Sequence, residues 1–445
     1  MTPAEITPAP IAASPEAREI RPPWDDQLTL RIPPHELATD PEISIVVPAL
    51  NEESSIAEFI DWCRVGIERA GVRGEIIIID SSTDRTGEIA LANGARVLKS
   101  PKRGLGRAYI DAIPFIRGRY VLMGDADCTY DFRSIAPFVE KFRQGYDFVI
   151  GSRFAGHIED GAMPALHRYF GTPLTSALLN LIYGSSFSDI HCGMRGMTLA
   201  ALRAMKLQSQ SWEYASEIIV KSIRLGLRST EVPIDFHKDR DGRLSHHRRA
   251  GWTSPWIAGW MNLRSMLVGG ADFFLIKPGM VLFGLGLATL LALCNGPIVV
   301  GKATLSLNAM LLGLTLAVVG LQAFLLGGVA RTLYDLLGEQ RRRWMAAFGF
   351  TRTLLFSTVA FGAGFWLASD FLKRYVSANY TVVPSAVPAD RRAVFGLFLI
   401  IAAFQATTAM LLIHGVAGFA PLAADRPVTD EARDAAGAPC STVSQ

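Results

Sequence analysis

"EISIVVPAL" (residues 42–50) and "GEIIIID" (74–80) are the two apolar runs that decide the fold, and a mixed segment from Ser54 to about Ala70 separates them. The alternation continues along the chain, with strands expected at 95–100 and 118–125 and helices near 86–92 and 104–117. Short apolar strands that alternate with helices predict an α/β domain with a largely parallel sheet, covered by helices on both faces. Ligands of such sheets bind at the carboxyl ends of the strands.

The composition favours a membrane-attached protein. Half of the 445 residues are hydrophobic, the mean hydropathy is +0.25, and the formal net charge is only +3. This small charge gives no indication of nucleic-acid binding. Residues 1–41 and 425–445 are polar and rich in Pro or Ala, and we expect both to be disordered tails.

Beyond Lys277, four long stretches lack Asp, Glu, Lys and Arg almost entirely. A helix needs about 20 apolar residues to cross the hydrocarbon core of a bilayer. We therefore expect a transmembrane region at 278–424, with three spans as the alternative to four. The four spans are expected near 278–301, 303–330, 350–369 and 393–420.

A tryptophan-rich segment at 251–277 precedes the first expected span. Five apolar residues recur there at helical spacing and would share one face of a helix: Trp252, Trp256, Trp260, Leu263 and Leu267. We expect an amphipathic helix at the headgroup boundary of the membrane. A core helix of the soluble domain is the alternative.

The stretch "MGDADCTYDF" (123–132) ends an apolar strand with two carboxylates, Asp125 and Asp127. Alternate side chains of a strand point to the same side, and two adjacent carboxylates repel unless a cation or a proton separates them. Hard oxygen ligands suit Mg²⁺ or Mn²⁺, usually shared with substrate phosphates. The pair therefore predicts a metal–diphosphate site.

Other strand ends carry polar residues as well. "VVPALNEE" (46–53) places Glu52 just after the first strand, and Asp80 ends the next, where a carboxylate could accept hydrogen bonds from a ribose or a base. "SPKRGLGRAY" (100–109) places Arg103 and two glycines at a helix start, which suits phosphate. No complete dinucleotide or P-loop motif is present.

Taken together, these motifs resemble family 2 glycosyltransferases of the dolichol-phosphate mannose synthase and polyprenyl-phosphate glycosyltransferase type, especially bacterial dolichol-phosphate-glucose synthase-like members. The resemblance covers about residues 43–250 and implies a GT-A-type, Rossmann-like nucleotide-sugar domain at 42–250. It rests on "SIVVPALNEE", "IIIIDSSTDRT", "RGLGRAYIDAI", "VLMGDADCTYDF", "FVIGSRF", "SDIHCGMRGM" and "EVPIDFHKDRDGRLSHHR".

The resemblance also implies roles for single residues. It assigns the metal–diphosphate site to Asp125, Ala126 and Asp127, and a contact near the phosphates to Arg153. Nucleotide contacts fall on Pro48, Leu50, Glu52 and Asp80. A loop that closes over the donor in the family falls on Arg240, Ser245 and His246, where His replaces the usual Lys. Thr129 stands where some members carry Gln, and its role stays open.

These expectations predict a membrane-bound, inverting, metal-dependent glycosyltransferase. It would transfer a hexose from a nucleotide-diphospho-sugar to a polyprenyl phosphate, with its catalytic domain on the cytoplasmic side of the inner (plasma) membrane. Arg168 and Arg195 are candidates for binding the acceptor phosphate, with structural salt bridges as the alternative reading. The sugar, the nucleotide and the oligomeric state stay open.

Three other functions are possible. Transfer to a lipid hydroxyl would require a base, for which Glu213 and Glu217 are candidates, although a solvated or salt-bridged helix face also explains them. A polysaccharide synthase would carry a Gln-x-x-Arg-Trp motif, which "QRRRW" (340–344) matches literally, but far from the catalytic domain. A non-catalytic membrane scaffold is the third, and the intact Asp-x-Asp pair argues against it.

Overall fold

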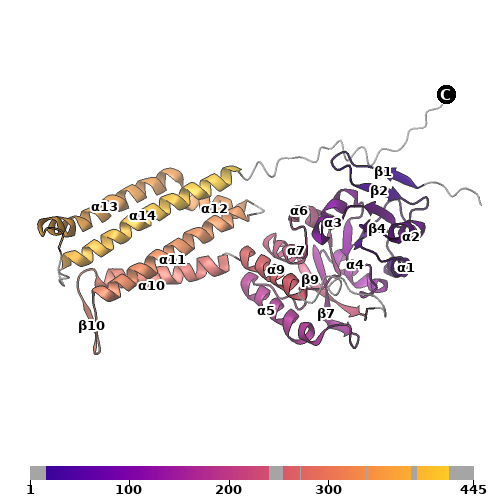
Figure 1. Ribbon diagram of the computed structural model, residues 1–445, viewed down its shortest axis with the longest axis horizontal. Coiled ribbons are helices and arrows are strands. Elements are labelled where there is room, and N and C mark those ends of the chain that lie inside the picture. Colours follow the sequence, from indigo (N-terminus) through magenta and orange to yellow (C-terminus); the bar gives the residue numbers. More distant parts are fainter. Residues whose placement is uncertain (1–16, 240–253, 271, 336–337, 382–387, 420–445) are drawn as a thin grey trace, which may run out of the picture. The chain divides into compact units, whose positions relative to one another are not determined.

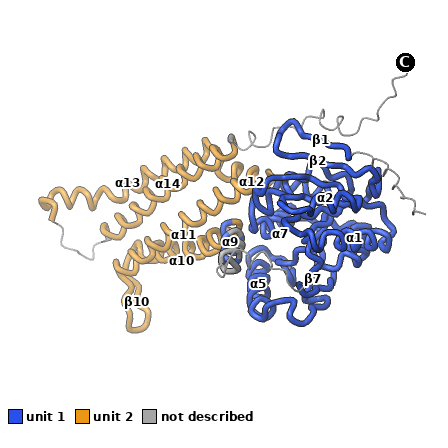
Figure 2. Tube along the Cα trace, turned by 45° about the vertical axis from the view of Figure 1, so that its right-hand side comes forward, with its two compact units in different colours: residues 1–268 blue, residues 269–445 orange. Residues whose placement is uncertain are grey.

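The computed structural model of the protein describes residues 17–239, 254–270, 272–335, 338–381 and 388–419. The chain forms two compact units, residues 1–268 (unit 1) and 269–445 (unit 2), shown in different colours in Figure 2. Each unit is described by itself below.

Unit 1 is built on a nine-stranded sheet with the order β1-β2-β5-β4-β3-β6-β8-β7-β9. Figure 1 labels five of these strands, β1, β2, β4, β7 and β9. Its centre is parallel, because β3 pairs in parallel with both β4 and β6, and β4 with β5. β8 runs antiparallel to β6 and β7. The predicted, mostly parallel sheet is therefore confirmed. The strands are β1 (Arg18–Ile20), β2 (Thr29–Ile32), β3 (Ile43–Ala49), β4 (Gly74–Asp80), β5 (Arg96–Lys99), β6 (Tyr120–Met123), β7 (Phe148–Ile158), β8 (Arg195–Thr198) and β9 (Ser229–Phe236).

Helices connect and cover these strands. α1 shows the pattern: Ile56, Phe59, Ile60 and Cys63 recur at helical spacing, and all are buried. Gly71 ends α1 in the left-handed conformation that glycine adopts without penalty. The helices of unit 1 are α1 (Ile56–Ala70), α2 (Thr86–Ala92), α3 (Leu105–Ala112), α4 (Ala136–Arg143), α5 (Thr172–Tyr183), α6 (Leu199–Met205), α7 (Tyr214–Arg224) and α9 (Ser254–Gly269).

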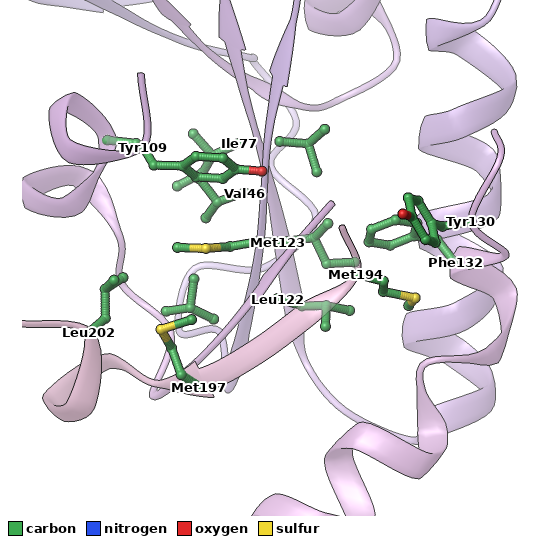
Figure 3. Close-up of a cluster of buried hydrophobic side chains, with 14 of the residues drawn as sticks. Val46, Ile77, Tyr109, Leu122, Met123, Tyr130, Phe132, Met194, Met197 and Leu202 are labelled. Carbon is green, nitrogen blue, oxygen red and sulfur yellow. The ribbon is translucent and has the colours of Figure 1, made fainter. Parts of the chain in front are cut away.

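The core lies around the central strands β3, β4 and β6. Every residue of β4 and of β6 is buried. This explains why residues 76–79 of β4 and 120–123 of β6 are apolar runs that do not alternate with polar residues. Figure 3 shows part of this core, with Leu122 and Met123 of β6 among side chains from other elements. The same packing fixes the position of the residues that follow β6.

A buried ionic network lies at the amino ends of the central strands. The Glu75 carboxylate accepts hydrogen bonds from Ser44 Oγ at 2.6 Å, Arg96 Nη1 at 2.8 Å and Arg117 Nε at 2.7 Å. Burial of Glu75 opposes its ionisation, but Arg96, Ser44 and Arg117 outweigh that effect and hold its pKa below the usual value. Arg117 also pairs with Glu36 at 2.9 Å. The network thus ties the chain before β3 to the sheet.

The expected disorder of residues 1–41 is wrong for residues 18–20 and 29–32, which form strands. β1 and β2 pair with each other, and β2 adds to the sheet beside β5. Leu28 and Leu30 are each only 1% exposed. Burial of two leucines and pairing of an otherwise open sheet edge order a segment whose composition alone favours disorder.

Unit 2 is helical. Four segments among its described residues are long and apolar enough to cross a membrane: Asp272–Leu293, Leu307–Leu333, Glu339–Ser377 and Ala389–Gly418. The helices are α10 (Lys277–Leu293), α11 (Leu307–Leu333), α12 (Glu339–Ala347), α13 (Phe350–Ser377) and α14 (Pro388–Phe419). The ends differ from those expected, because 298–300 and 303–305 form a hairpin of two short strands, β10 (Ile298–Val300) and β11 (Ala303–Leu305), and do not extend the helices.

Glycines allow the unit 2 helices to approach closely. A Cβ on Gly286 of α10 would lie 2.2 Å from the Ala317 nitrogen of α11, and one on Gly364 of α13 would lie 2.5 Å from the Gly396 oxygen of α14. Such small-residue contacts are typical of helices packed in membranes. In "QRRRW", Trp344 lies against Gly328 of α11, at 2.3 Å from a Cβ built there. This contact gives the tryptophan a packing role inside unit 2.

Candidate functional site

The carboxyl ends of β3 and β4 are held together by side-chain hydrogen bonds. The Asn51 N–H donates to Ser82 Oγ at 2.8 Å, the Thr83 N–H to Asn51 Oδ1 at 3.0 Å, and the Glu52 N–H to Thr86 Oγ1 at 2.9 Å. Asn51 adopts a left-handed backbone conformation (φ 57°), which Asn tolerates better than most residues. The polar residues after these strands thus meet at one edge of the sheet.

The segment after β6 joins the same edge. Ser55 Oγ donates to the Ala126 carbonyl at 3.2 Å and to Glu52 Oε2 at 3.1 Å. This brings the Asp-x-Asp segment next to the chain that follows β3, as the sequence predicts. β6 itself ends at Met123, so Asp125 and Asp127 lie in the turn beyond the strand. Strand alternation therefore does not set their directions.

Gly193 lies against Asp125. A Cβ built on Gly193 would be 2.8 Å from Asp125 Oδ2 and 3.0 Å from Tyr130 Oη. The Gly193 N–H also donates to Tyr130 Oη at 2.8 Å. Because glycine has no side chain, position 193 leaves room for the Asp125 carboxylate. The motif "HCGMRG" alone does not connect Gly193 with the aspartates, because 68 positions separate Gly193 from Asp125.

The two aspartates fit a divalent metal ion. Both are half-buried, and both offer hard carboxylate oxygens. Within the described ranges, no group of three or more His, Cys, Asp and Glu residues is placed to bind a metal. Two carboxylates are a suitable protein contribution for Mg²⁺ or Mn²⁺ when substrate phosphates and water supply the remaining ligands.

Buried tyrosines lie near Asp125, and a buried cation, Arg195, lies over the ring of one of them, Tyr214. Tyr109 and Tyr214 stack with ring centroids 4.8 Å apart. Burial raises the pKa of Tyr109 well above its usual value, and Tyr214 and Asp125 raise it further. Arg195 is only 2% exposed and donates to the carbonyls of Ala215 at 2.9 Å and Cys192 at 2.5 Å. The predicted acceptor role of Arg195 thus falls on a side chain inside the core.

The predicted nucleotide residues lie at or just beyond their strand ends. Pro48 belongs to β3, Leu50 follows it, and both are half-buried. Asp80 ends β4 and is buried, with Oδ1 accepting from the Ser82 N–H at 2.9 Å and Oδ2 from Lys99 Nζ at 2.9 Å. Internal partners therefore occupy both oxygens of Asp80, and its nucleotide contact stays a prediction.

The "RGLG" segment has a structural role that the sequence did not indicate. A Cβ on Gly104 would lie 2.2 Å from the Gln210 carbonyl oxygen, and one on Gly106 would lie 2.2 Å from that of Ser209. Arg103 forms an ion pair with Asp25, in the connection between β1 and β2. The glycines allow close backbone packing, and Arg103 holds the N-terminal hairpin. Arg103 thus has an internal partner, and its phosphate contact stays a prediction.

Arg153 is also engaged inside the protein. Its Nε donates to Asp189 Oδ2 at 2.7 Å and its Nη2 to Asp189 Oδ1 at 2.8 Å, and the side chain is 8% exposed. Burial disfavours its charge, but Tyr130 and Asp189 hold the pKa of Arg153 above its usual value. The geometry gives Arg153 a bidentate structural pair, and a direct contact with phosphate stays a prediction.

Arg168 lies on a different surface. It belongs to the short helical turn His167–Gly171 before α5, is half-buried, and lies 5.6 Å from the ring of Tyr169. Large apolar side chains around it are more than half exposed: Leu166 54%, Tyr169 74%, Phe170 62%, Leu174 52% and Leu181 65%. These five residues are called the α5 apolar face below. Arg240, Ser245 and His246 lie outside the described residues.

Glu217 and His191 both have internal hydrogen-bond partners. Glu217 accepts from the N–H groups of Gln208 and Ser209 at 2.9 Å each, and pairs with Lys221 at 2.6 Å. The salt-bridged reading of Glu217 is therefore confirmed. His191 Nε2 lies 2.9 Å from Thr175 Oγ1, and burial lowers the pKa of His191 to about 4. It is neutral at physiological pH.

Polar residues that meet at the carboxyl ends of parallel strands, beside an Asp-x-Asp turn, mark this edge of the sheet as a ligand site. The model of "Glycosyl transferase family 2" matches residues 44–205. The low-salt glycan biosynthesis hexosyltransferase Agl6 of Haloferax volcanii is 34% identical over 376 residues, covering 81% of this chain and 88% of that protein. The chain belongs to glycosyltransferase family 2. Unit 1 has 268 residues, so the alignment extends into unit 2.

Two other relatives match a shorter part of the chain than Agl6 does. A dolichyl-phosphate hexose transferase of Haloferax volcanii is 29% identical, over 47% of this chain and 89% of that protein. An undecaprenyl-phosphate 4-deoxy-4-formamido-L-arabinose transferase of Edwardsiella ictaluri is 28% identical, over 45% of this chain and 61% of that protein. Each of these two alignments covers less than half of this chain.

Proposed function

We propose that this protein transfers a hexose from a nucleotide-diphospho-sugar to a polyprenyl phosphate, on the cytoplasmic side of the inner membrane. The observation that carries the proposal is the Asp125–Asp127 turn at the carboxyl edge of the sheet. The described residues of the same chain also include four apolar helices of spanning length. The names of two relatives, which act on dolichyl phosphate and undecaprenyl phosphate, support the choice of acceptor.

Asp125 and Asp127 would hold a Mg²⁺ or Mn²⁺ ion, whose positive charge would offset the negative charge on the leaving diphosphate. In the reaction, an oxygen of the acceptor phosphate forms a bond to the anomeric carbon. The bond from that carbon to the nucleoside diphosphate breaks, and the diphosphate leaves with the electron pair. Attack from the opposite side gives inversion at the anomeric carbon.

The acceptor needs little activation. A phosphate monoester has its second pKa near 6, and at pH 7 most of it is dianionic. A general base is therefore not required of the protein. The protein's task is to exclude water and to hold the acceptor phosphate near the donor. Correct positioning of the two reactants alone can accelerate the reaction greatly.

The α5 apolar face would bring this acceptor to the site. Monomeric soluble proteins rarely expose large contiguous apolar patches, and such patches mark interaction surfaces. Tyr169 and Phe170 are 74% and 62% exposed, and Arg168 lies beside them. Aromatic and basic side chains together suit the headgroup region of a bilayer. Arg168 is thus our candidate for binding the acceptor phosphate.

The donor would lie along the strand ends. Glu52 and Asp80 are buried at this edge, so they would shape the nucleotide site by holding the turns that follow β3 and β4. Arg195 is a buried cation, and no ion pair of it is found in the described part of the chain. Its positive field would favour a diphosphate near Asp125.

One observation favours a second candidate function, transfer to a lipid hydroxyl. Glu213 precedes α7, and its Oε2 is buried without a hydrogen-bond partner among the described residues. An unpaired carboxylate oxygen could accept a proton from a hydroxyl. That reaction would need the base that a phosphate acceptor does not need.

Product chemistry tests the proposal. Membranes that contain the protein are incubated with a panel of radiolabelled nucleotide sugars and polyprenyl phosphate, with Mn²⁺ or with EDTA. We expect label in an acid-labile lipid, only with the metal, and none with Asp127→Asn. Label in an alkali-stable glycolipid or a long polymer would contradict the proposed acceptor.

A further inference from the structure

Thr129 directly follows the Asp-x-Asp turn and bonds to it. Its backbone N–H donates to Asp127 Oδ1 at 3.0 Å, and its Oγ1 hydroxyl donates to the same oxygen at 2.6 Å. Thr129 is only 6% exposed. Two donors on one oxygen restrict the rotation of the Asp127 carboxylate about its χ2 angle, so this side chain is oriented before any ligand binds.

The backbone takes an unfavourable conformation to make this contact. Cys128, between the two residues, has φ 59° and is not a glycine. A left-handed conformation costs a residue with a Cβ about 1–2 kcal/mol. The hydrogen bonds to Asp127 offset this cost. Cys128 is buried, and its Sγ lies 3.9 Å from the Ser55 carbonyl oxygen, so packing also holds the turn.

The other side of Thr129 is fixed to the sheet. Its carbonyl accepts from the His237 N–H at 2.8 Å, just after β9 ends. Tyr130 next to it forms a bridge with Phe236. The end of β9 therefore holds Thr129 in place, and through Thr129 it helps to orient Asp127.

We propose that Thr129 is a positioning residue for Asp127, which fixes the direction in which that carboxylate meets the metal–diphosphate group. This inference rests on the proposed function, because it assigns Asp127 to the metal site. Residues that hydrogen-bond to metal ligands typically change metal affinity or activity by about 10–100-fold when they are replaced. A threonine with only a packing role would change neither.

Two substitutions separate these roles. Thr129→Val keeps the shape of the side chain and the backbone N–H but removes the hydroxyl donor. Thr129→Ser keeps the hydroxyl and removes a methyl group. Thr304→Val is the matched control, because Thr304 lies in the exposed strand β11 of unit 2. Thermal unfolding of each variant measures any change in stability.

Mn²⁺ binding to the purified full-length protein in detergent, with UDP and without it, is measured by the loss of the electron paramagnetic resonance signal of free Mn²⁺. We expect Thr129→Val to weaken Mn²⁺ binding by about 10–100-fold. Thr129→Ser is expected to bind Mn²⁺ within about threefold of the unsubstituted protein, because serine keeps the hydroxyl that donates to Asp127. Thr304→Val is expected to bind unchanged.

The outcomes distinguish the two claims. If the unsubstituted protein binds Mn²⁺ and Thr129→Val binds it equally well, the positioning role is wrong and the proposed function stands. A Thr129→Ser variant as weak as Thr129→Val would also overturn the role, since the hydroxyl would then be irrelevant. If the unsubstituted protein binds no Mn²⁺ with or without UDP, the metal site of the proposed function fails first.

Discussion

Gly193→Ala tests the geometry around Asp125 with a single added methyl group. The new Cβ would lie 2.8 Å from Asp125 Oδ2, whereas ordinary van der Waals contact begins at 3.4 Å. The carboxylate must therefore move by about 0.6 Å, or the chain around Gly193 must move instead. A misplacement of about 1 Å at a reacting centre can cost roughly 100-fold in rate. We expect transfer activity to fall by about 10–100-fold.

The assay compares activity with stability. An inserted methyl group in a packed region typically costs about 1–3 kcal/mol of folding free energy, so the variant should stay folded while transfer is lost. Gly362→Ala is the control, because no atom lies within 4 Å of a Cβ built at this exposed position of α13. If Gly193→Ala keeps transfer activity within about twofold of the unsubstituted protein and needs the same Mn²⁺ concentration, Gly193 does not set the position of Asp125.

Three other predictions concern stability and the lipid. Glu75→Gln removes the charge at the centre of the buried network and should destabilise unit 1 by about 3 kcal/mol or more in denaturant unfolding. The folded protein lowers the pKa of Glu75, so the stability that its charge provides is present at pH 7 and is lost as the pH falls below about 4. Equal losses of stability on substitution at pH 7 and at pH 3 would contradict this prediction. Replacing Tyr169 and Phe170 by Ser should raise the KM for polyprenyl phosphate at least about tenfold, with an unchanged KM for the nucleotide sugar, and a change in the donor KM alone would argue against the α5 apolar face. Gly364→Leu should lower the thermal stability of unit 2, since its Cβ would lie 2.5 Å from the Gly396 oxygen, whereas Gly362→Leu should not; equal effects of the two would exclude close packing as the cause.

The sequence predicted the central sheet well, because buried strands such as "EIIIID" are recognisable from composition and length alone. It also predicted that Glu52, Asp80 and the aspartate pair meet at one edge, since the carboxyl ends of parallel strands must do so. Local pattern was sufficient for each of these predictions.

The remaining features depend on distant parts of the chain. The pairing of Arg103 with Asp25 could not be predicted, because Asp25 is 78 positions away in a segment with the composition of a disordered tail. The glycines of "RGLG" serve close packing against Ser209 and Gln210, which no local motif reveals. Arg195 is in the core because β8 inserts between β6 and β7, an arrangement that does not follow chain order.

The turn after β6 illustrates the same limit at short range. Strand alternation was the reason to expect Asp125 and Asp127 side by side, yet β6 ends at Met123 and the aspartates lie beyond it. Their arrangement depends on the left-handed Cys128, on Thr129 and on Gly193. A single sequence shows these residue types but not the contacts that give them a role.

The nature of the acceptor is the central claim, and one measurement tests it most directly. The purified protein is given a nucleotide sugar that it uses, together with polyprenyl phosphate or with the matching unphosphorylated polyprenol, and the lipid products are identified by mass spectrometry. We predict a polyprenyl-phospho-sugar from the phosphate and no product from the alcohol. Glycosylation of the alcohol at a comparable rate, abolished by Glu213→Gln, would contradict the account and would favour transfer to a hydroxyl.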